Sequence, residues 1–236
     1  MLKKWSLLLL SVSISGCGVV YQGVTNGVDS FSQSQVFRQG RHASLTEEEL
    51  MWAQTAWKYI DNNTQVTTGL VNSIDNFPTT NMAGLADYLI SLIAAREFEF
   101  ISNKEYDERL TLVLSFLNEM DLSYGYAPNK VYSTQSGDMV NYGNQPQDIG
   151  WSSLDVGRLL IALAIVKRHS PEFSEYVDKA GLRWNFCELI SLDGELYGSM
   201  IQDGQLIRYK EGRLGLEEYT SYGYLDWQIV PEKAMN

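Results

Sequence analysis

The chain contains little cysteine and little histidine. Of its 236 residues only Cys17 and Cys187 are cysteines, and only His42 and His169 are histidines. Zinc sites need clusters of His and Cys, and a nucleophilic Cys needs a His within reach, so neither chemistry is expected. EF-hand spacing is also lacking, and we expect no metal and no cofactor. Cys187 has apolar neighbours and is predicted to be a small buried residue.

Basic residues are scarce as well. Eighteen Lys and Arg stand against 29 Asp and Glu, which gives a net charge of -11 at pH 7. Removal of residues 1–17 takes away two lysines, so the remaining charge is 16 minus 29, or -13. Such a surface repels nucleic acid and anionic lipid headgroups. The charge therefore excludes nucleic acid as a partner and favours a neutral glycan or a basic protein.

The N-terminal apolar run is too short to span a bilayer. It extends from Trp5 to Ile14, follows two lysines and is followed by Ser15-Gly16-Cys17, a pattern that resembles a bacterial lipoprotein signal. Residues 1–17 are predicted to be this signal peptide. Cys17 is predicted to carry the lipid anchor, which includes a palmitate group. An ordinary secretory signal that is cleaved elsewhere is the alternative. The residue after Cys17, Gly18, indicates a lipoprotein of the outer membrane. We therefore expect the protein to be lipid-anchored to this membrane on its periplasmic face.

The rest of the chain is predicted to be one domain behind a tether. Residues 18–44 are rich in Ser, Gln, Gly and Asn and have no sustained period, which is typical of a flexible tether. Residues 45–236 have the length of one domain. Apolar residues recur there at steps of three and four, which predicts helices at 46–62, 81–97, from 103, at 152–169, from 170 and from about 216.

The connections indicate the fold class. The first helix begins with a capping box from Thr46 to Glu49, and most helices follow one another through short connections. This is the pattern of an all-α domain of antiparallel helical hairpins. Asp203-Gly204 separates two stretches without helical period, which predicts a small β-hairpin near residues 195–210.

A polar loop at residues 127–151 precedes the helix at 152–169. Carboxylates, amides and aromatic rings are dense in it: Asp138, Asn141, Tyr142, Asn144, Gln147, Asp148 and Trp151. These groups suit a polyhydroxylated ligand, because amides and acids bond hydroxyl groups and rings stack on sugar faces. We expect the chain to act as a framework that holds this loop.

Several separated motifs resemble one known family. They are Asn72-Ser73-Ile74-Asp75 with Pro78-Thr79-Thr80, SLIAAR at 91–96, Pro128-Asn129-Lys130, GWSSLDVGRLL from Gly150, and GRLGLEEYTSYGY from Gly212. Over roughly Leu50 to Trp227 the chain resembles the bacterial domain of unknown function 3131 family. The resemblance implies a glucoamylase-like α/α toroid that acts on β-glucans or envelope polysaccharides.

The sequence departs from that family in two ways. Ala83-Gly84 stands where many members have a Trp-Asp pair, and this would remove one acid from the cleft. A complete toroid needs about twelve helices, whereas about six are predicted here. A partial toroid, a truncated product and a lobe completed by a protein partner remain open.

The chemistry is predicted to depend on acids. Glycoside hydrolysis uses two carboxyl groups, of which one protonates the leaving oxygen and the other activates water or attacks. Asp148, Asp155 and Glu218 are the predicted catalytic residues. Asp155 has an alternative role as a helix cap and Asp148 as a residue that holds its turn. Glu217 and Glu218 are neighbours on a helix, so one is expected to point inward.

The predicted ligand contacts combine rings, amides and charged groups. They are Asp75, Asn129, Lys130, Tyr132, Tyr142, Trp151, Arg213 and Glu217. About half of the aromatic candidates are expected to be core instead, because aromatic residues more often pack than bind. Arg158 is expected to contact either an acid or the ligand.

Two functions follow from these residues. The first is a glycoside hydrolase-like enzyme that cleaves a periplasmic or exported polysaccharide or oligosaccharide. The second is a non-catalytic lipoprotein that binds such a glycan, or an assembly partner, through the same cleft. Both require the segment 132–151 and the corner at 217–218 to meet over one hollow.

Overall fold

The computed structural model describes residues 44–191, 194–212 and 217–229, without the side chains of Glu217 and Glu218. The chain divides into two units, Met1–Leu50 and Met51–Asn236. The predicted signal peptide, the lipidated Cys17 and nearly all of the predicted tether lie outside the described residues. In the described ranges no helix is both long enough and apolar enough to cross a membrane.

The first described helix, α3 (Glu47–Asn63), begins with the predicted capping box. The N–H of Thr46 donates to the Glu49 carboxylate at 2.8 Å, and the N–H of Glu49 donates to Thr46 Oγ1 at 3.3 Å. Each residue therefore satisfies a free N–H group of the other, as the spacing requires. The predicted helix at 46–62 is confirmed.

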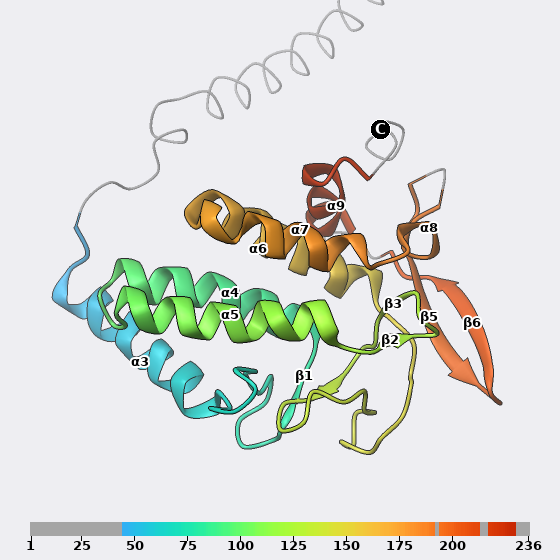
Figure 1. The fold of residues 1–236 in the computed structure, drawn as a ribbon, viewed down its shortest axis with the longest axis horizontal. Coiled ribbons are helices and arrows are strands. Elements are labelled where there is room, and N and C mark those ends of the chain that lie inside the picture. Colours follow the sequence, from blue (N-terminus) through green and yellow to red (C-terminus); the bar gives the residue numbers. More distant parts are fainter. Residues whose placement is uncertain (1–43, 192–193, 213–216, 230–236) are drawn as a thin grey trace, which may run out of the picture. The chain divides into compact units, whose positions relative to one another are not determined.

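Two antiparallel hairpins follow in the unit Met51–Asn236. The first joins α4 (Met82–Glu97) to α5 (Asn103–Glu119), and the second joins α6 (Ser153–His169) to α7 (Ser174–Leu182) through the 3₁₀ turn η1 (Pro171–Phe173). Figure 1 shows α4 and α5 side by side, with α6 and α7 packed against them. The hairpins therefore form two layers, α4 with α6 and α5 with α7.

The helices α4 and α6 run in the same direction. Near their beginnings Arg158 on α6 forms an ion pair with Asp87 on α4, at 2.6 Å. Near their ends the Arg96 guanidinium donates to Ser170 Oγ at 3.2 Å. Their N-termini therefore lie at the same end of the layer, where side chains from both helices can line one surface.

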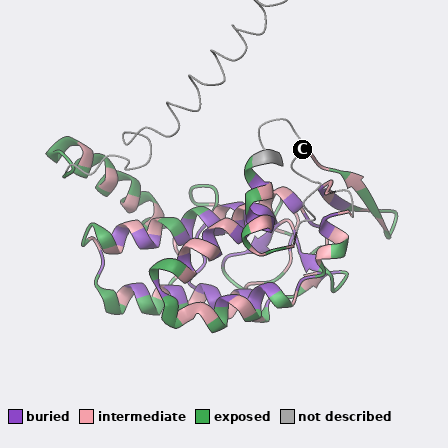
Figure 2. Cartoon of the chain, turned by 90° about the horizontal axis from the view of Figure 1, so that it is seen from above, coloured by how far each residue is buried: buried purple, intermediate pink, exposed green. Residues whose placement is uncertain are grey.

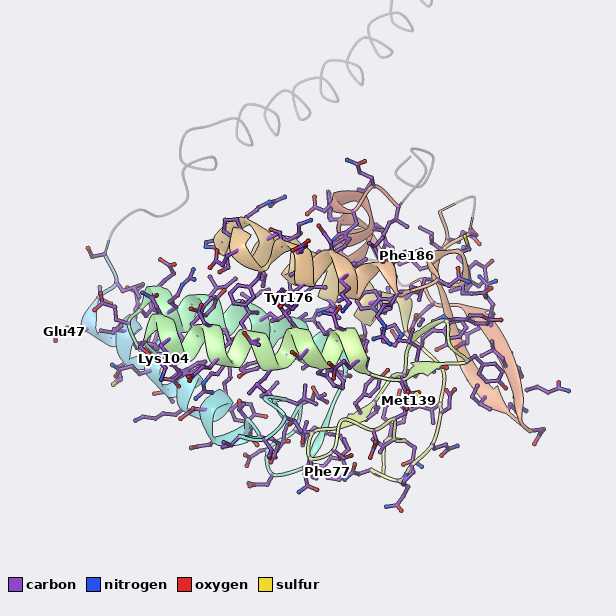
Figure 3. The ribbon with its side chains drawn as sticks, viewed as in Figure 1. Glu47, Phe77, Lys104, Met139, Tyr176 and Phe186 are labelled. Carbon is purple, nitrogen blue, oxygen red and sulfur yellow. The ribbon has the colours of Figure 1, made fainter. Side chains whose placement is uncertain are left out.

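The connections at the two ends of these helices differ greatly in length. The chain turns from α4 to α5 within residues 98–102, but residues 64–81 and 120–152 precede α4 and α6. Figure 3 places Phe77 and Met139, from the two long connections, at one end of the helices and Lys104 at the other. Long connections at one end of a rigid framework are the usual position of a binding site.

Short strands join the long connections to one another. β1 (Thr79–Thr80) pairs with β4 (Tyr132–Ser133), and β2 (Leu122–Ser123) pairs with β3 (Ala127–Pro128). A side-chain bond from Thr134 Oγ1 to Asn72 Oδ1, at 2.6 Å, adds to the first pair. The two loops are thus built as one structure.

The predicted β-hairpin is confirmed as β5 (Tyr197–Gln202) and β6 (Gln205–Lys210). Asp203 and Gly204 both have positive φ, 52° and 74°, which is the geometry of a tight two-residue hairpin turn. The short helix α8 (Phe186–Leu189), which precedes the hairpin, was not predicted. Within it Leu189 is buried and Cys187 is exposed, so the predicted burial of Cys187 was wrong.

The core lies between the two helical layers. Figure 2 shows buried residues along the facing sides of the helices. The apolar stripe predicted on α6 is fully buried: Val156, Leu159, Leu160, Leu163 and Val166. Tertiary burial of this stripe, more than helix propensity, stabilises the helix.

The last helix, α9 (Glu217–Asp226), crosses α6 at two glycines. A Cβ atom added to Gly223 would lie 2.1 Å from the carbonyl oxygen of Gly157, and one added to Gly157 would lie 2.7 Å from the carbonyl oxygen of Thr220. The two backbones therefore approach more closely than any side chain would allow.

We predict that Gly223→Ala destabilises the protein. Replacing Gly by Ala at an exposed helical position stabilises a protein by up to about 1 kcal/mol. The added methyl group here must instead separate α6 from α9, which lowers the stability by about 1–3 kcal/mol. Urea unfolding measures the difference. Gly143→Ala is the control, because its Cβ would meet only the Asn141 side chain, at 3.3 Å. A gain in stability for Gly223→Ala would contradict the close crossing.

Candidate functional site

The candidate site is built on the first turn of α6. Ser152 is the N-cap, and its hydroxyl oxygen accepts the N–H of Asp155 at 3.2 Å. One oxygen of Glu211, which directly follows β6, accepts the N–H of Ser153 at 2.6 Å, its hydroxyl at 2.9 Å and the N–H of Leu154 at 3.4 Å. Glu211 thus satisfies the free donors of the helix end and ties the hairpin to it.

The carboxyl group of Asp155 lies where its negative charge is unfavourable. Burial, followed by the negative charge of Glu211, raises the pKa of Asp155 to about 6, against the positive charges of Arg158 and Lys130. In the part of the chain that the structure describes, the carboxyl group of Asp155 makes no hydrogen bond, and its backbone N–H donates to Ser152. A carboxyl group with such a pKa exists partly as the acid near neutral pH and can donate a proton.

Lys130 lies on the same site, anchored to the hairpin. Its ammonium group donates to the carbonyl oxygen of Ser199 at 2.6 Å and lies 5.5 Å from the centre of the Tyr209 ring. Burial lowers the pKa of Lys130, and the charges of Glu211 and Asp155 oppose this effect. The lysine therefore supplies a positive charge beside two acids.

Tyr142 occupies the tip of a turn next to these groups. The side-chain oxygen of Asn141 accepts the N–H groups of Gly143 and Gln145, at 2.9 and 3.1 Å, which fixes the turn. The ring is 71% exposed. Partial burial of the hydroxyl group, and then the charges of Asp155 and Glu211, raise the pKa of Tyr142. An exposed ring thus lies near a partly buried acid.

A family model described as "Protein of unknown function (DUF3131)" matches residues 51–236. The chain belongs to this family. The predicted family resemblance is confirmed, and the match covers the unit that carries α4 to α9. No curated protein matches the chain.

Solved structures share the fold of this DUF3131 member. A beta-1,2-glucanase from Parabacteroides distasonis matches with a TM-score of 0.54 and 18% identity, over 70% of this chain and 25% of its own. A candidate glucoamylase from Bacteroides uniformis ATCC 8492 matches with a TM-score of 0.53 and 16% identity, over 69% of this chain and 42% of its own. The chain therefore spans less than half the length of either structure.

These matches confirm the predicted fold class. The DUF3131 domain is an all-α arrangement of antiparallel helical hairpins that forms a partial α/α toroid, and β5–β6 is its small β-hairpin. In the described ranges, no group of three His, Cys, Asp or Glu side chains could hold a metal ion.

Three of the predicted ligand contacts are fully buried. Tyr132 donates its hydroxyl hydrogen to the Asp121 carbonyl at 2.7 Å, and the indole N–H of Trp151 donates to the Tyr197 carbonyl at 3.1 Å. The amide of Asn129 bonds the backbone of its own loop, through Val131, Val140 and Ile149. The prediction that these side chains meet a ligand was wrong, because the loop uses them to close over its own core.

Two predicted acids hold turns. Asp148 accepts from Ser123 Oγ at 2.6 Å and from the N–H groups of Gly150 and Tyr124, at 3.0 and 3.1 Å, so of its two predicted roles the turn is the one observed. Asp75 is exposed and accepts from the amides of Asn63 and Asn76, both at 2.9 Å.

The remaining predicted residues divide into two groups. Asp155, Lys130 and Tyr142 come together at the start of α6, as described above. Arg213 lies outside the described residues, as do the side chains of Glu217 and Glu218. Glu211 was missed, although it directly precedes the motif that begins at Gly212, because no local pattern pairs it with a helix start.

We predict that Asp155→Asn stabilises the protein at pH 8. The folded-state pKa lies above the ordinary value of 3.8, so the stability due to the neutral acid is complete below about pH 4 and is lost as the pH rises through 6. Asn avoids this loss, with an expected gain of about 1–3 kcal/mol at pH 8. The gain should vanish near pH 4.

Urea unfolding at both pH values measures this effect. Asp107→Asn makes the same change on the exposed surface of α5 and should alter stability by less than about 0.5 kcal/mol at either pH. A gain for Asp155→Asn that does not depend on pH would show that desolvation of the charge is not its cause.

Proposed function

We propose that this protein cleaves a neutral glycan by acid-assisted glycoside hydrolysis, with Asp155 as the proton donor. The raised pKa of Asp155, about 6, is the observation that carries the proposal. A glycosidase needs one carboxyl group that remains protonated near its working pH so that it can protonate the leaving oxygen. Tyr142 would stack on the sugar, and Lys130 would bond its hydroxyl groups.

The fold supports the same substrate class. The DUF3131 domain shares its toroid fold with a protein described as a beta-1,2-glucanase. The net charge of -11 disfavours anionic polymers. We therefore propose a β-linked, uncharged polysaccharide or oligosaccharide as the ligand, with Glu218 as the candidate for the second carboxyl group.

The N-terminal sequence supports an envelope location for this activity. We propose that residues 1–17 are a lipoprotein signal and that Cys17 anchors the protein by its lipid to the outer membrane, on the periplasmic face. The tether at 18–44 would let the domain reach glycan away from the membrane surface. A protein partner that adds further helices to the domain is also part of the proposal.

The second candidate function is glycan binding without catalysis. Among the described acids, the one whose charge raises the pKa of Asp155 is Glu211, and Glu211 is engaged at the N-terminus of α6. A carboxylate that accepts three hydrogen bonds is poorly placed to attack or to activate water. Asp155 would then serve as a hydroxyl-binding group in a cleft that holds the glycan.

We predict that Asp155→Asn lowers turnover of β-1,2-glucan by about 10²–10⁴-fold, the usual contribution of a positioned general acid. New reducing ends are measured on β-1,2-glucan and on a panel of other β-glucans. Asp107→Asn should retain wild-type turnover. Equal activity of Asp155→Asn and the wild type would refute the assignment of the proton donor.

A wild-type protein that binds glucan but releases no reducing ends from any substrate would establish the second candidate function. Glucan binding by the wild type and by Asp155→Asn is therefore measured beside turnover, by isothermal titration calorimetry. This separates loss of chemistry from loss of the ligand.

We predict that Glu211→Gln shifts the pH dependence of kcat/KM. The amide oxygen can still accept the N–H of Ser153, so the helix end remains capped, but the negative charge beside Asp155 is gone. The pKa of Asp155 should fall, and the alkaline limb of the profile should move down by about one unit. A lower kcat with an unmoved limb would mean that Glu211 has a structural role alone.

A further inference from the structure

A hollow lies between α3 and α4, on the side of the long connections. Its volume is about 600 Å³, which falls within the roughly 300–1,000 Å³ of small-ligand sites. Both polar and apolar residues line it. The polar ones include Asn72, Ser73, Asn81, Asp87 and Arg158, and the apolar ones include Ile60, Val71 and Ala83.

This hollow adjoins Asp155 through Arg158. Arg158 lines the hollow and follows Asp155 by three residues on α6, so the two side chains lie on the same helix face. The charge of Arg158 is also felt at the Asp155 carboxyl group, whose pKa it lowers. A ligand that extends from Asp155 past Arg158 therefore enters the hollow.

We propose that the hollow binds a further unit of the same neutral glycan, so that the site takes an internal stretch of a chain rather than a single terminal sugar. This rests on the proposed function only in the identity of the ligand. It requires binding of a glycan and does not require cleavage.

The Asp87–Arg158 pair is chemically suited to a sugar. The two side chains are 64% and 39% exposed, and they meet at 2.6 Å. A carboxylate accepts from one hydroxyl group while a guanidinium donates to its neighbour, so the pair can bond adjacent hydroxyl groups of a pyranose. The pair is neutral as a whole, which disfavours a charged sugar. The half-exposed ring of Tyr59 offers apolar surface for its C–H face.

A purely structural role for this ion pair is the competing explanation, and it predicts only a small loss of stability when the pair is broken. An exposed ion pair between two helices contributes little stability because water screens it and both side chains lose freedom. Asp87→Asn should therefore fold normally. The same reasoning gives a control, since Asp61 on α3 also pairs with an arginine of another helix, Arg109 on α5, and does not line the hollow.

The experiment is a binding ladder on the full chain. Isothermal titration calorimetry measures the affinity for β-1,2-linked gluco-oligosaccharides from disaccharide to octasaccharide, at a pH where the wild type is stable. The proteins are the wild type, Asp87→Asn, Ser73→Ala and the control Asp61→Asn. Thermal unfolding of each variant checks that it is folded. Binding is the readout because Arg158, once released from Asp87, can turn to Asp155 and change turnover indirectly.

We expect the wild type to bind the longer oligosaccharides more tightly than the disaccharide. Asp87→Asn should weaken binding of the longer ones by roughly tenfold, the loss that follows from removing one charged hydrogen-bond partner. Its affinity for the disaccharide should stay within about twofold of the wild type, since that ligand is held at Asp155. Ser73→Ala should show a smaller effect of the same kind, and Asp61→Asn none.

Several results would overturn the proposal. They are equal affinity for all lengths, unchanged binding of long oligosaccharides by folded Asp87→Asn and Ser73→Ala, and preference for an anionic oligogalacturonate of the same length. If Asp155→Asn abolishes turnover while the ladder shows no dependence on length, the hollow is not a subsite and the proposed function stands. If length-dependent binding is lost in Asp87→Asn and the wild type cleaves nothing, the subsite stands and catalysis does not.

Discussion

The satisfied N-terminus of α6 is the constraint on which the site depends. Glu211 accepts the N–H groups of Ser153 and Leu154, and Ser152 accepts that of Asp155. A free helix N-terminus would stabilise a nearby carboxylate and lower its pKa. Here Glu211 already occupies that position, and its charge acts on Asp155 in the opposite direction. Burial, together with the charge of Glu211, therefore raises the pKa of Asp155 to about 6 although it lies in the first turn of a helix.

The sequence was sufficient for features that depend on near neighbours. The apolar stripe of α6, the capping box from Thr46 to Glu49 and the turn at Asp203-Gly204 all repeat or close within a few residues, and each was predicted correctly. The contact between Glu211 and Ser153 joins residues that are 58 positions apart. It depends on the route of the β5–β6 hairpin back to α6, which no local pattern specifies.

The polar loop before α6 shows why composition alone misjudged ligand contacts. A long connection must satisfy its own backbone and fill its own interior, and it uses amides and aromatic rings to do so. Asn129 and Trp151 serve these purposes, so they have the residue types of a sugar site without its exposure. Tyr142 differs only in its place at the tip of a turn. Exposure, which the sequence does not give, separates the two roles.

Arg158 connects the acid to the adjoining hollow because Asp87 and Asp155 compete for it. It pairs with Asp87 at 2.6 Å, and its attraction for Asp155 is outweighed by burial and by Glu211. A ligand that drew Asp87 away would release Arg158 toward Asp155 and favour the ionised carboxylate. A ligand that bonded both members of the pair would hold Arg158 in place and keep Asp155 as the acid. Under the proposed subsite, occupancy of the hollow and protonation of Asp155 would be thermodynamically linked in both directions, within one turn of α6.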